Sequence, residues 1–394
     1  MAGPDHVSQD TIAVRAGRAD NGGALAPVVW ASSTFEMASL EDARRQAMRP
    51  RATRFYGRHG NPSVRAFEDA VAALEGAEAA MAFASGMGAF CAVVLGLCNQ
   101  GSHIVAQRQC YGGSTQLLAG VCPRFGIDVT FVDATEPGAF AAAVQPGRTM
   151  LLLAETPANP RLDLVDLDEI AAITGPIKMV DSTVATPLGQ QPLAHGIDLV
   201  LHSATKSMAG HNDAVLGVVA GARDLIEWIW GFAVLQGATA SPYDATNALR
   251  GLRTLGVRLR QQSTTATELA RVLEHHSAVS EVRHPSLASH PRFELAQRQL
   301  RITGGLLSFE LTGGLAAGER FMHEVQLCLA ATSFGGPETL VTHPASTTHA
   351  GLTEEEMVQS GIGPGTIRVS CGLEGTEDVV ADVIGALDRL SQPG

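Results

Sequence analysis

Two lysines are the only side-chain amines in this chain, and they lie in different settings. Lys206 follows the apolar run Leu199–His202, whereas Lys178 lies close to a proline and is typical of a surface residue. The carboxyl ends of parallel strands are where α/β proteins bind ligands. A lysine there, next to the hydroxyls of Ser203 and Thr205, suits a Schiff base with a phosphorylated aldehyde. The alternative is an ordinary surface lysine in a loop.

Pyridoxal phosphate, an aldehyde cofactor of this kind, makes three further demands on a protein. Its ring nitrogen needs a carboxylate that keeps it protonated, and Asp181 ends the predicted strand Ile177–Val180. Its phosphate needs backbone N–H groups, which the segment 85–88 can offer at the start of a helix. Its ring needs an aromatic face, and Tyr111 is followed by two glycines that allow close approach. Each feature is common alone, but their order along the chain favours pyridoxal phosphate.

The elements that would position these residues alternate along the chain. Short apolar runs are separated by segments with helical spacing, such as Ser63–Leu74 and Gly88–Leu97. Continuously apolar strands are typical of a parallel sheet covered on both faces, which predicts an α/β fold. The predicted strands are Ala79–Ala84, His103–Ala106, Ile127–Val132, Met150–Ala154, Ile177–Val180, Leu199–His202 and Val215–Ala220.

The length of 394 residues predicts more than one domain, because one hydrophobic core rarely supports so long a chain. Residues 1–60 show no long helical period and are interpreted as an arm, followed by a large domain at residues 61–255. A long helix at Val257–His275 leads into a smaller α+β domain at residues 256–394. This domain would contain the strands Leu306–Leu311 and Thr366–Ser370.

The composition argues against several classes of partner. A net charge of −12 without a basic stripe disfavours nucleic acid and an acidic membrane surface. No apolar stretch reaches the roughly 18 residues that span a bilayer, and the first residues do not resemble a signal peptide. The 13 histidines and 6 cysteines show no metal-ligand spacing, so no metal site is predicted. We therefore expect a cytoplasmic enzyme that acts on a small molecule.

A series of short motifs runs in order along nearly the whole chain, from Thr11 to Leu387. The motifs are Tyr56-Gly-Arg58, Asn61-Pro62, Ser85-Gly-Met87, Tyr111-Gly-Gly113, Glu155-Thr-Pro-Ala-Asn-Pro160, Asp181-Ser-Thr183, His202-Ser-Ala-Thr-Lys206, Gly210-His211, Ser333-Phe-Gly-Gly336 and Ile367-Arg-Val-Ser370. Together they resemble the Cys/Met-metabolism family of pyridoxal-phosphate enzymes: cystathionine γ-synthases, cystathionine γ- and β-lyases, methionine γ-lyases and O-acylhomoserine sulfhydrylases. The resemblance implies the type I, aspartate-aminotransferase-like fold, with a mostly parallel seven-stranded sheet and a smaller α+β domain.

The resemblance also implies roles for individual residues. Lys206 would carry the cofactor and act as the base that moves protons, and Asp181 would pair with the pyridine nitrogen. Tyr111 would stack on the ring and donate a proton to the leaving group. Tyr56 and Arg58 would reach the cofactor of the neighbouring subunit, and Tyr56 would belong to the catalytic residues. This implies a homo-oligomer, and the family resemblance suggests a tetramer built from two dimers. The phosphate would be held by Gly86, Met87, Ser203 and Thr205.

Substrate binding would fall largely to the C-terminal part. Arg368 would bind the α-carboxylate with its planar fork, helped by Asn159 and the backbone at Ser333; the alternative for Arg368 is a surface salt bridge. Thr332 stands where family members that hold the distal end of cystathionine commonly carry glutamate, which favours an uncharged side chain such as that of methionine. Gly113, however, stands where methionine γ-lyases typically carry cysteine.

The predicted reaction is the elimination of a thiol from methionine or cystathionine, with 2-oxobutanoate and ammonia as the other products. The alternative is γ-replacement, either cystathionine synthesis or sulfhydrylation of an O-acylhomoserine, because the segment His343–His349 resembles both methionine lyases and sulfhydrylases. A catalytically silent binding protein is a hypothesis from another class. The presence of Lys206 together with Asp181 and Arg368 argues against it.

Overall fold

A seven-stranded sheet forms the larger part of the computed structural model, which describes residues 7–347, 357 and 361–390. The strand order is β1-β7-β6-β5-β4-β2-β3. Strands β2 to β6 run parallel, whereas β7 pairs antiparallel with both β1 and β6. The predicted type I, mostly parallel sheet is thereby confirmed. The strands are β1 (Ala79–Phe83), β2 (His103–Gln107), β3 (Asp128–Val132), β4 (Thr149–Glu155), β5 (Ile177–Asp181), β6 (Leu199–His202) and β7 (Gly217–Gly221).

Helices cover both faces of this sheet: α3 (Pro62–Glu75) and α10 (Pro242–Leu252) on one, α4 (Gly86–Leu97) and α9 (Arg223–Gln236) on the other. Adjacent strand residues point to opposite faces, so Val200 packs on the α3 side and Leu201 on the α4 side. This double burial explains why the strands are continuously apolar. Shorter elements connect them: α5 (Gly112–Gln116), a π-helical turn (Leu117–Val121), α6 (Ala139–Ala143), α7 (Leu167–Ala171), α8 (Thr186–Gly189) and 3₁₀ turns at Cys122–Phe125 and Pro192–His195.

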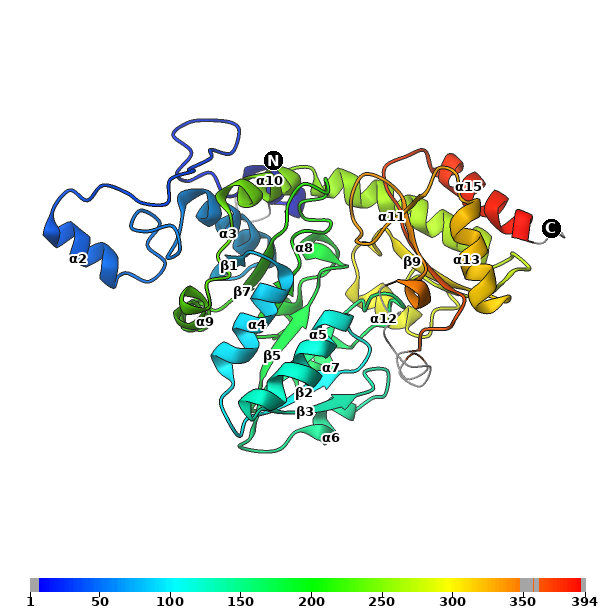
Figure 1. Cartoon of the computed structure of the whole chain (residues 1–394), viewed down its shortest axis with the longest axis horizontal. Coiled ribbons are helices and arrows are strands. Elements are labelled where there is room, and N and C mark those ends of the chain that lie inside the picture. Colours follow the sequence, from blue (N-terminus) through cyan, green and yellow to red (C-terminus); the bar gives the residue numbers. More distant parts are fainter. Residues whose placement is uncertain (1–6, 348–356, 358–360, 391–394) are drawn as a thin grey trace.

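A five-stranded sheet lies beside the first, and α11 (Leu255–Leu273) runs from one to the other (Figure 1). Its strand order is β10-β11-β12-β9-β8, and the strands predicted at Leu306–Leu311 and Thr366–Ser370 are its β9 and β12. Leu269, Phe309 and Val383 belong to its core. The division of the chain at residues 60 and 255 stays a prediction. The remaining elements are β8 (Val279–Arg283), α12 (Phe293–Gln299), α13 (Gly314–Glu324), β10 (Leu329–Ala330), β11 (Leu340–Thr342), a 3₁₀ turn (Pro344–Ser346) and α15 (Thr376–Leu390).

The N-terminal segment contains two short helices that the sequence patterns do not predict, α1 (Gln9–Arg15) and α2 (Leu40–Met48). Each is too short to display a clear helical period and begins after a serine cap, at Ser8 and Ser39. Helix α1 packs on the body of the chain and buries Ala13. Helix α2 buries no residue and lies away from both sheets (Figure 1).

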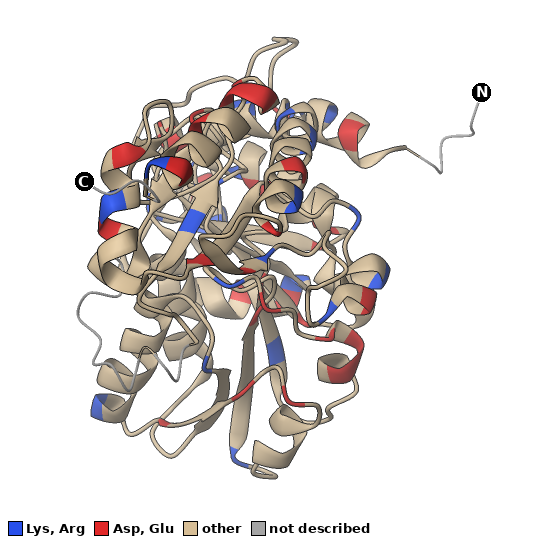
Figure 2. Ribbon diagram, turned by 90° about the vertical axis from the view of Figure 1, so that its right-hand side faces the viewer, with Lys and Arg blue, Asp and Glu red and all other residues tan. Residues whose placement is uncertain are grey.

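The distribution of charge is mixed. Figure 2 shows acidic and basic residues interspersed over the helices, without a continuous basic stripe in that view. Within the residues that the structure describes, no helix is both long and apolar enough to cross a membrane.

Candidate active site

A cavity of about 490 Å³ lies at the carboxyl ends of β4, β5 and β6, where the large sheet meets the second sheet. The cavity is lined by residues at the ends of β4, β5 and β6 and by Arg368 on β12. Two of the predicted site residues, Tyr56 and Arg58, are not part of it. The predicted residues that line it are Gly86, Met87, Tyr111, Asn159, Asp181, Ser203, Thr205, Lys206, Thr332, Ser333 and Arg368.

Lys206 lies in the turn after β6, where its backbone N–H donates to the Ser203 carbonyl at 3.1 Å. Its Nζ atom is 2.7 Å from Ser333 Oγ and 5.2 Å from the centroid of the Phe334 ring. Burial, and then the positive charge of Arg368, lower the pKa of Lys206 to about 8. A larger share of its amine is therefore unprotonated near neutral pH than in an ordinary lysine. The unprotonated amine is the form that attacks an aldehyde.

Asp181 is the last residue of β5 and borders the cavity. Its Oδ1 accepts hydrogen bonds from the backbone N–H and the hydroxyl of Thr183, at 2.9 and 2.5 Å. Burial raises the pKa of Asp181, and the bonds from Thr183 oppose this in part. No salt bridge to Asp181 is found within the described part of the chain. A protonated pyridine nitrogen would supply the missing cation.

Glu155 also borders the cavity, although the sequence patterns assign it no role. It is the last residue of β4, in register with Asp181 on β5, and only 6% exposed. Its carboxylate oxygens accept the backbone N–H groups of Tyr111 at 2.7 Å and Asn159 at 2.8 Å. Burial, and then the charge of Asp181, raise the pKa of Glu155 to about 8. The sequence did offer one signal for a role of Glu155, because it is a charged residue that ends a largely apolar strand.

The N-terminus of α4 and the turn after β6 approach each other at Gly86. A Cβ atom there would lie 2.9 Å from the Cβ of Ser203, so a side chain at Gly86 would force the two segments apart. Ser85 caps the helix by accepting the Gly88 N–H at 3.0 Å. The first N–H groups of α4, at Gly86 and Met87, lack intrahelical partners, as at any helix start. An anion is stabilised at such an end.

The two hydroxyls predicted for the phosphate differ in their contacts. Within the described residues, the Ser203 hydroxyl has no hydrogen-bond partner and is available. The Thr205 hydroxyl donates to the Leu216 carbonyl at 3.2 Å and accepts the Leu216 N–H at 2.9 Å. Thr205 therefore fixes the turn to the chain before β7, and it could donate to a phosphate only by releasing the Leu216 carbonyl.

Arg368 lies on β12 and is only 4% exposed. Its guanidinium donates to Asn159 Oδ1 at 3.1 Å and to the Ser333 carbonyl at 2.6 Å. It also donates to Thr342 Oγ1 at 3.0 Å, and its buried Nε has no partner within the described residues. Ser333 adopts φ +77°, a left-handed conformation rare for serine, and contacts both Arg368 and Lys206. Arg368 is thus no surface salt bridge, and a buried guanidinium without a carboxylate partner suits a substrate carboxylate.

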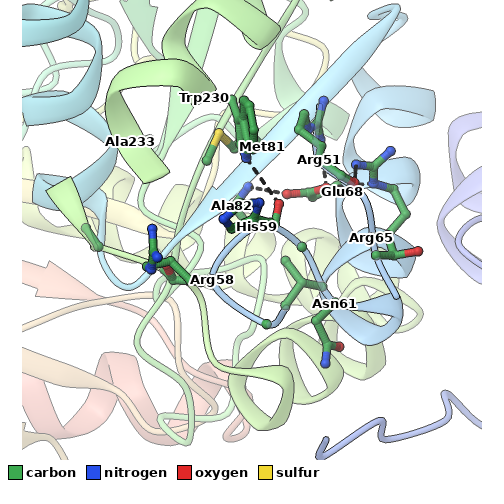
Figure 3. Close-up of a pocket in the computed structure, with 16 residues that line it drawn as sticks. Arg51, Arg58, His59, Asn61, Arg65, Glu68, Met81, Ala82, Trp230 and Ala233 are labelled. Atoms are coloured by element: carbon green, nitrogen blue, oxygen red, sulfur yellow. Dashed lines mark hydrogen bonds and ion pairs between the residues drawn. The ribbon is translucent and has the colours of Figure 1, made fainter. Parts of the chain in front are cut away.

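Tyr56 and Arg58 lie in the loop between α2 and α3, outside the cavity. Figure 3 shows Arg58 beside a separate small pocket, of about 20 Å³, that is lined in part by β1. Arg58 Nη1 donates to the Val234 carbonyl at 2.8 Å, and the Tyr56 side chain is 44% exposed. Arg51 fastens this loop to α3 through Glu68 at 2.7 Å. The chain does not bring Tyr56 and Arg58 to its own cavity, and their contribution to a neighbouring subunit stays a prediction.

The cavity fits pyridoxal phosphate on three independent features. It combines a lysine of lowered pKa, a partly buried carboxylate that has no salt-bridge partner among the described residues, and a helix N-terminus at a glycine where a Cβ atom would clash with Ser203. Fold and site together define a type I pyridoxal-phosphate enzyme. The chain belongs to the family described as Cys/Met metabolism PLP-dependent enzymes, which matches residues 10–388.

Named relatives of the chain catalyse more than one reaction. The L-methionine gamma-lyase of Pseudomonas deceptionensis is 40% identical over 378 residues, or 94% of each protein. The O-succinylhomoserine sulfhydrylase of Pseudomonas aeruginosa is 39% identical and covers 97% of this chain and 95% of its own length. The crystal structure of cystathionine gamma synthase from Xanthomonas oryzae pv. oryzae in complex with cystathionine is 37% identical, with a TM-score of 0.91 and 98% of both chains covered. These relatives show the family but leave the reaction open.

Proposed function

We propose that this enzyme is a γ-lyase that eliminates a thiol from a sulfur amino acid, methionine or cystathionine, and releases 2-oxobutanoate and ammonia. The charges around the cavity carry the proposal. Within the described residues, its charged lining consists of Glu155, Asp181, Lys206 and Arg368, all engaged at the cofactor and α-carboxylate end. None of these charged side chains is left to bind a charged group at the far end of a substrate, which favours the uncharged thioether of methionine. The uncharged lining includes Met87, Phe90, Leu201, Val215, Thr332 and Phe334.

The chemistry divides between the cofactor and the side chains around it. Pyridoxal phosphate, when bound, supplies an electron sink that makes the Cα and Cβ protons of the substrate removable. Arg368 binds the α-carboxylate, and Asn159 orients it. Lys206 removes and returns the protons, since its lowered pKa suits a base near neutral pH. Tyr111 donates a proton to the departing sulfur, and Asp181 keeps the pyridine nitrogen protonated.

The same proposal assigns the residues that hold the cofactor and complete the site. The first N–H groups of α4, at Gly86 and Met87, and the Ser203 hydroxyl bind the phosphate, with Thr205 holding the turn beside it. Tyr56 and Arg58 serve the neighbouring subunit in a homotetramer, which their position outside their own cavity supports. We also propose a cytoplasmic location, as the composition of the chain leads us to expect.

A substrate panel tests the reaction. Purified enzyme with pyridoxal phosphate is incubated with methionine, cystathionine, or O-acetylhomoserine with and without a thiol, and 2-oxo acid and thioether products are measured. We expect 2-oxobutanoate from methionine or cystathionine to dominate. Thioether from O-acetylhomoserine, with negligible 2-oxobutanoate from the other two, would reject the lyase in favour of replacement.

γ-Replacement is the second candidate. The sulfhydrylase and synthase relatives are almost as similar to the chain as the lyase. Gly113, at a position where methionine γ-lyases typically carry cysteine, also favours it. The segment 348–349 of the His343–His349 motif lies outside the described residues.

A further inference from the structure

Glu155 connects two parts of the active site that lie far apart in the sequence. It accepts the N–H of Tyr111, which follows β2, and the N–H of Asn159, four residues further along its own segment. Asn159 in turn accepts a hydrogen bond from Arg368 through Oδ1. One buried carboxylate thus contacts the backbone of the proposed proton donor and of the residue that orients the carboxylate-binding arginine.

The placement of the Tyr111 ring depends on this backbone contact. Its side chain is 50% exposed, and within the described residues it makes no hydrogen bond and no aromatic ring contact. Tyr111 precedes α5 without a side-chain cap, so its own N–H needs an acceptor from elsewhere in the fold. Glu155 Oε2 provides that acceptor at 2.7 Å.

A carboxyl group suits this position, because each of its two oxygens can accept a hydrogen bond. The N–H groups of Asn159 and Tyr111 favour its ionised form and oppose the rise in pKa that burial and Asp181 cause. Glutamine would offer one acceptor oxygen and turn its NH₂ group toward the other N–H. Aspartate would shorten the reach by one methylene. Gln107 Oε1 accepts the backbone N–H of Glu155 at 2.8 Å, which fixes the start of the side chain. The side chain of Glu155 therefore presents one acceptor oxygen to the Tyr111 N–H and the other to the Asn159 N–H.

We propose that Glu155 is a positioning residue that sets the orientation of Tyr111 and Asn159 for elimination. This inference rests on the proposed role of Tyr111 as proton donor to the leaving group. A misplacement of about 1 Å at a reacting group costs on the order of 10²-fold in rate. Glu155→Gln therefore slows elimination by about 10- to 100-fold more than it slows exchange of the substrate α-proton, because that exchange depends on Lys206 and not on Tyr111.

Two measurements test this proposal in Glu155→Gln. The first is amide hydrogen exchange by mass spectrometry on the cofactor-free protein, over the peptides that contain Tyr111 and Asn159. The second, on the holoenzyme, compares 2-oxobutanoate formation from methionine with α-proton exchange of alanine in D₂O by NMR. We expect faster amide exchange in both peptides and a lowered ratio of elimination to α-proton exchange.

Asp382→Asn is the matched control. Asp382 also accepts backbone N–H groups, those of Gln326, Leu327 and Cys328 at 2.8 to 2.9 Å, but it does not line the cavity. Its replacement should speed amide exchange at residues 326–328 and leave the ratio of elimination to α-proton exchange unchanged. If Glu155→Gln does not fold, Glu155→Asp undergoes the same two measurements with the same expected directions.

Tyr111→Phe separates this inference from the proposed function. Suppose that Tyr111→Phe lowers the ratio of elimination to α-proton exchange, as its donor role requires. The positioning role of Glu155 is then overturned by either of two results in the Glu155 variant: unchanged amide exchange at Tyr111 and Asn159, or equal losses of elimination and α-proton exchange. If Tyr111→Phe lowers elimination and α-proton exchange equally, the donor role of Tyr111 is wrong, and the amide exchange alone decides whether Glu155 holds the two segments.

Discussion

Gly113→Ala should impair elimination far more than Gly112→Ala, although the two glycines are neighbours in the first turn of α5. A Cβ atom at Gly113 would lie 2.5 Å from Tyr111 Cε1 and 3.2 Å from Met87 Sδ. A Cβ atom at Gly112 would meet nothing within 4 Å. In this chain the Tyr111 ring thus occupies the space that a side chain at position 113 would need. A methionine γ-lyase with cysteine at this position has to place the ring differently, so the clash is specific to the ring position found here.

The size of the effect follows from the contact distance. Ordinary van der Waals contact begins near 3.4 Å, so the ring edge has to move by about 0.9 Å, the difference from 2.5 Å. The ring is half exposed and can move toward solvent at little cost in stability, and alanine is better than glycine in a helix by up to about 1 kcal/mol. The melting temperature should therefore change little, whereas a displacement of this size at the proposed proton donor should cost on the order of 10²-fold in rate.

The assay compares both alanine variants with the parent enzyme. Pyridoxal phosphate affinity, the melting temperature and the rate of 2-oxobutanoate release from methionine are measured under the same conditions. Gly113→Ala should keep the cofactor and lose most of its elimination activity, while Gly112→Ala should behave like the parent enzyme in all three measurements. Equal activity of the two variants would refute the link between the space at Gly113 and the placement of Tyr111.

Two further predictions concern the charged residues of the cavity. Because the pKa of Lys206 is lowered to about 8, the rate at which the cofactor-free protein recombines with pyridoxal phosphate should rise with pH through about 8 and level off above it; a rate that still climbs at about pH 10, where ordinary lysines titrate, would contradict the lowered pKa. Arg368→Lys should raise KM for methionine by about 10- to 100-fold, with a smaller change in kcat and unchanged cofactor affinity. An ammonium cannot bind both oxygens of a carboxylate as a planar guanidinium can, and it also loses the hydrogen bonds that hold Arg368 to Asn159 and Ser333. A drop in kcat at constant KM would assign Arg368 to another step.

The strands that carry the site were predictable, because their burial on both faces demands unbroken apolar runs. Leu199–His202 is β6 as predicted, and Ile177–Val180 gains only Asp181 in β5. Helix α4 begins two residues earlier than its apolar pattern indicates, since glycines at its start carry no hydrophobic signal while Ser85 caps it. Helix α2 escaped prediction because its nine residues are too few to display a clear helical period, and in the fold it buries no residue.

The role of a site residue could be predicted from the sequence where only one type of side chain can perform the chemistry. An aldehyde cofactor needs an amine, and Lys206 is one of two in the chain. A carboxylate at a strand end and an arginine in an apolar strand were likewise visible as Asp181 and Arg368. The side chains that these residues contact were not visible, because the strand ends that meet at the cavity are far apart in the sequence.

The sequence by itself thus determined which functional groups the enzyme has and along which strands they lie. The tertiary structure alone decided how they are held: Ser333 joins Lys206 to Arg368, and Glu155 holds Tyr111. The physical reason is the range of the forces involved. Apolar periodicity and caps act over a few residues, whereas the hydrogen bond between the end of β4 and the turn after β2 forms only when these two strands, which are not consecutive along the chain, pair in the sheet.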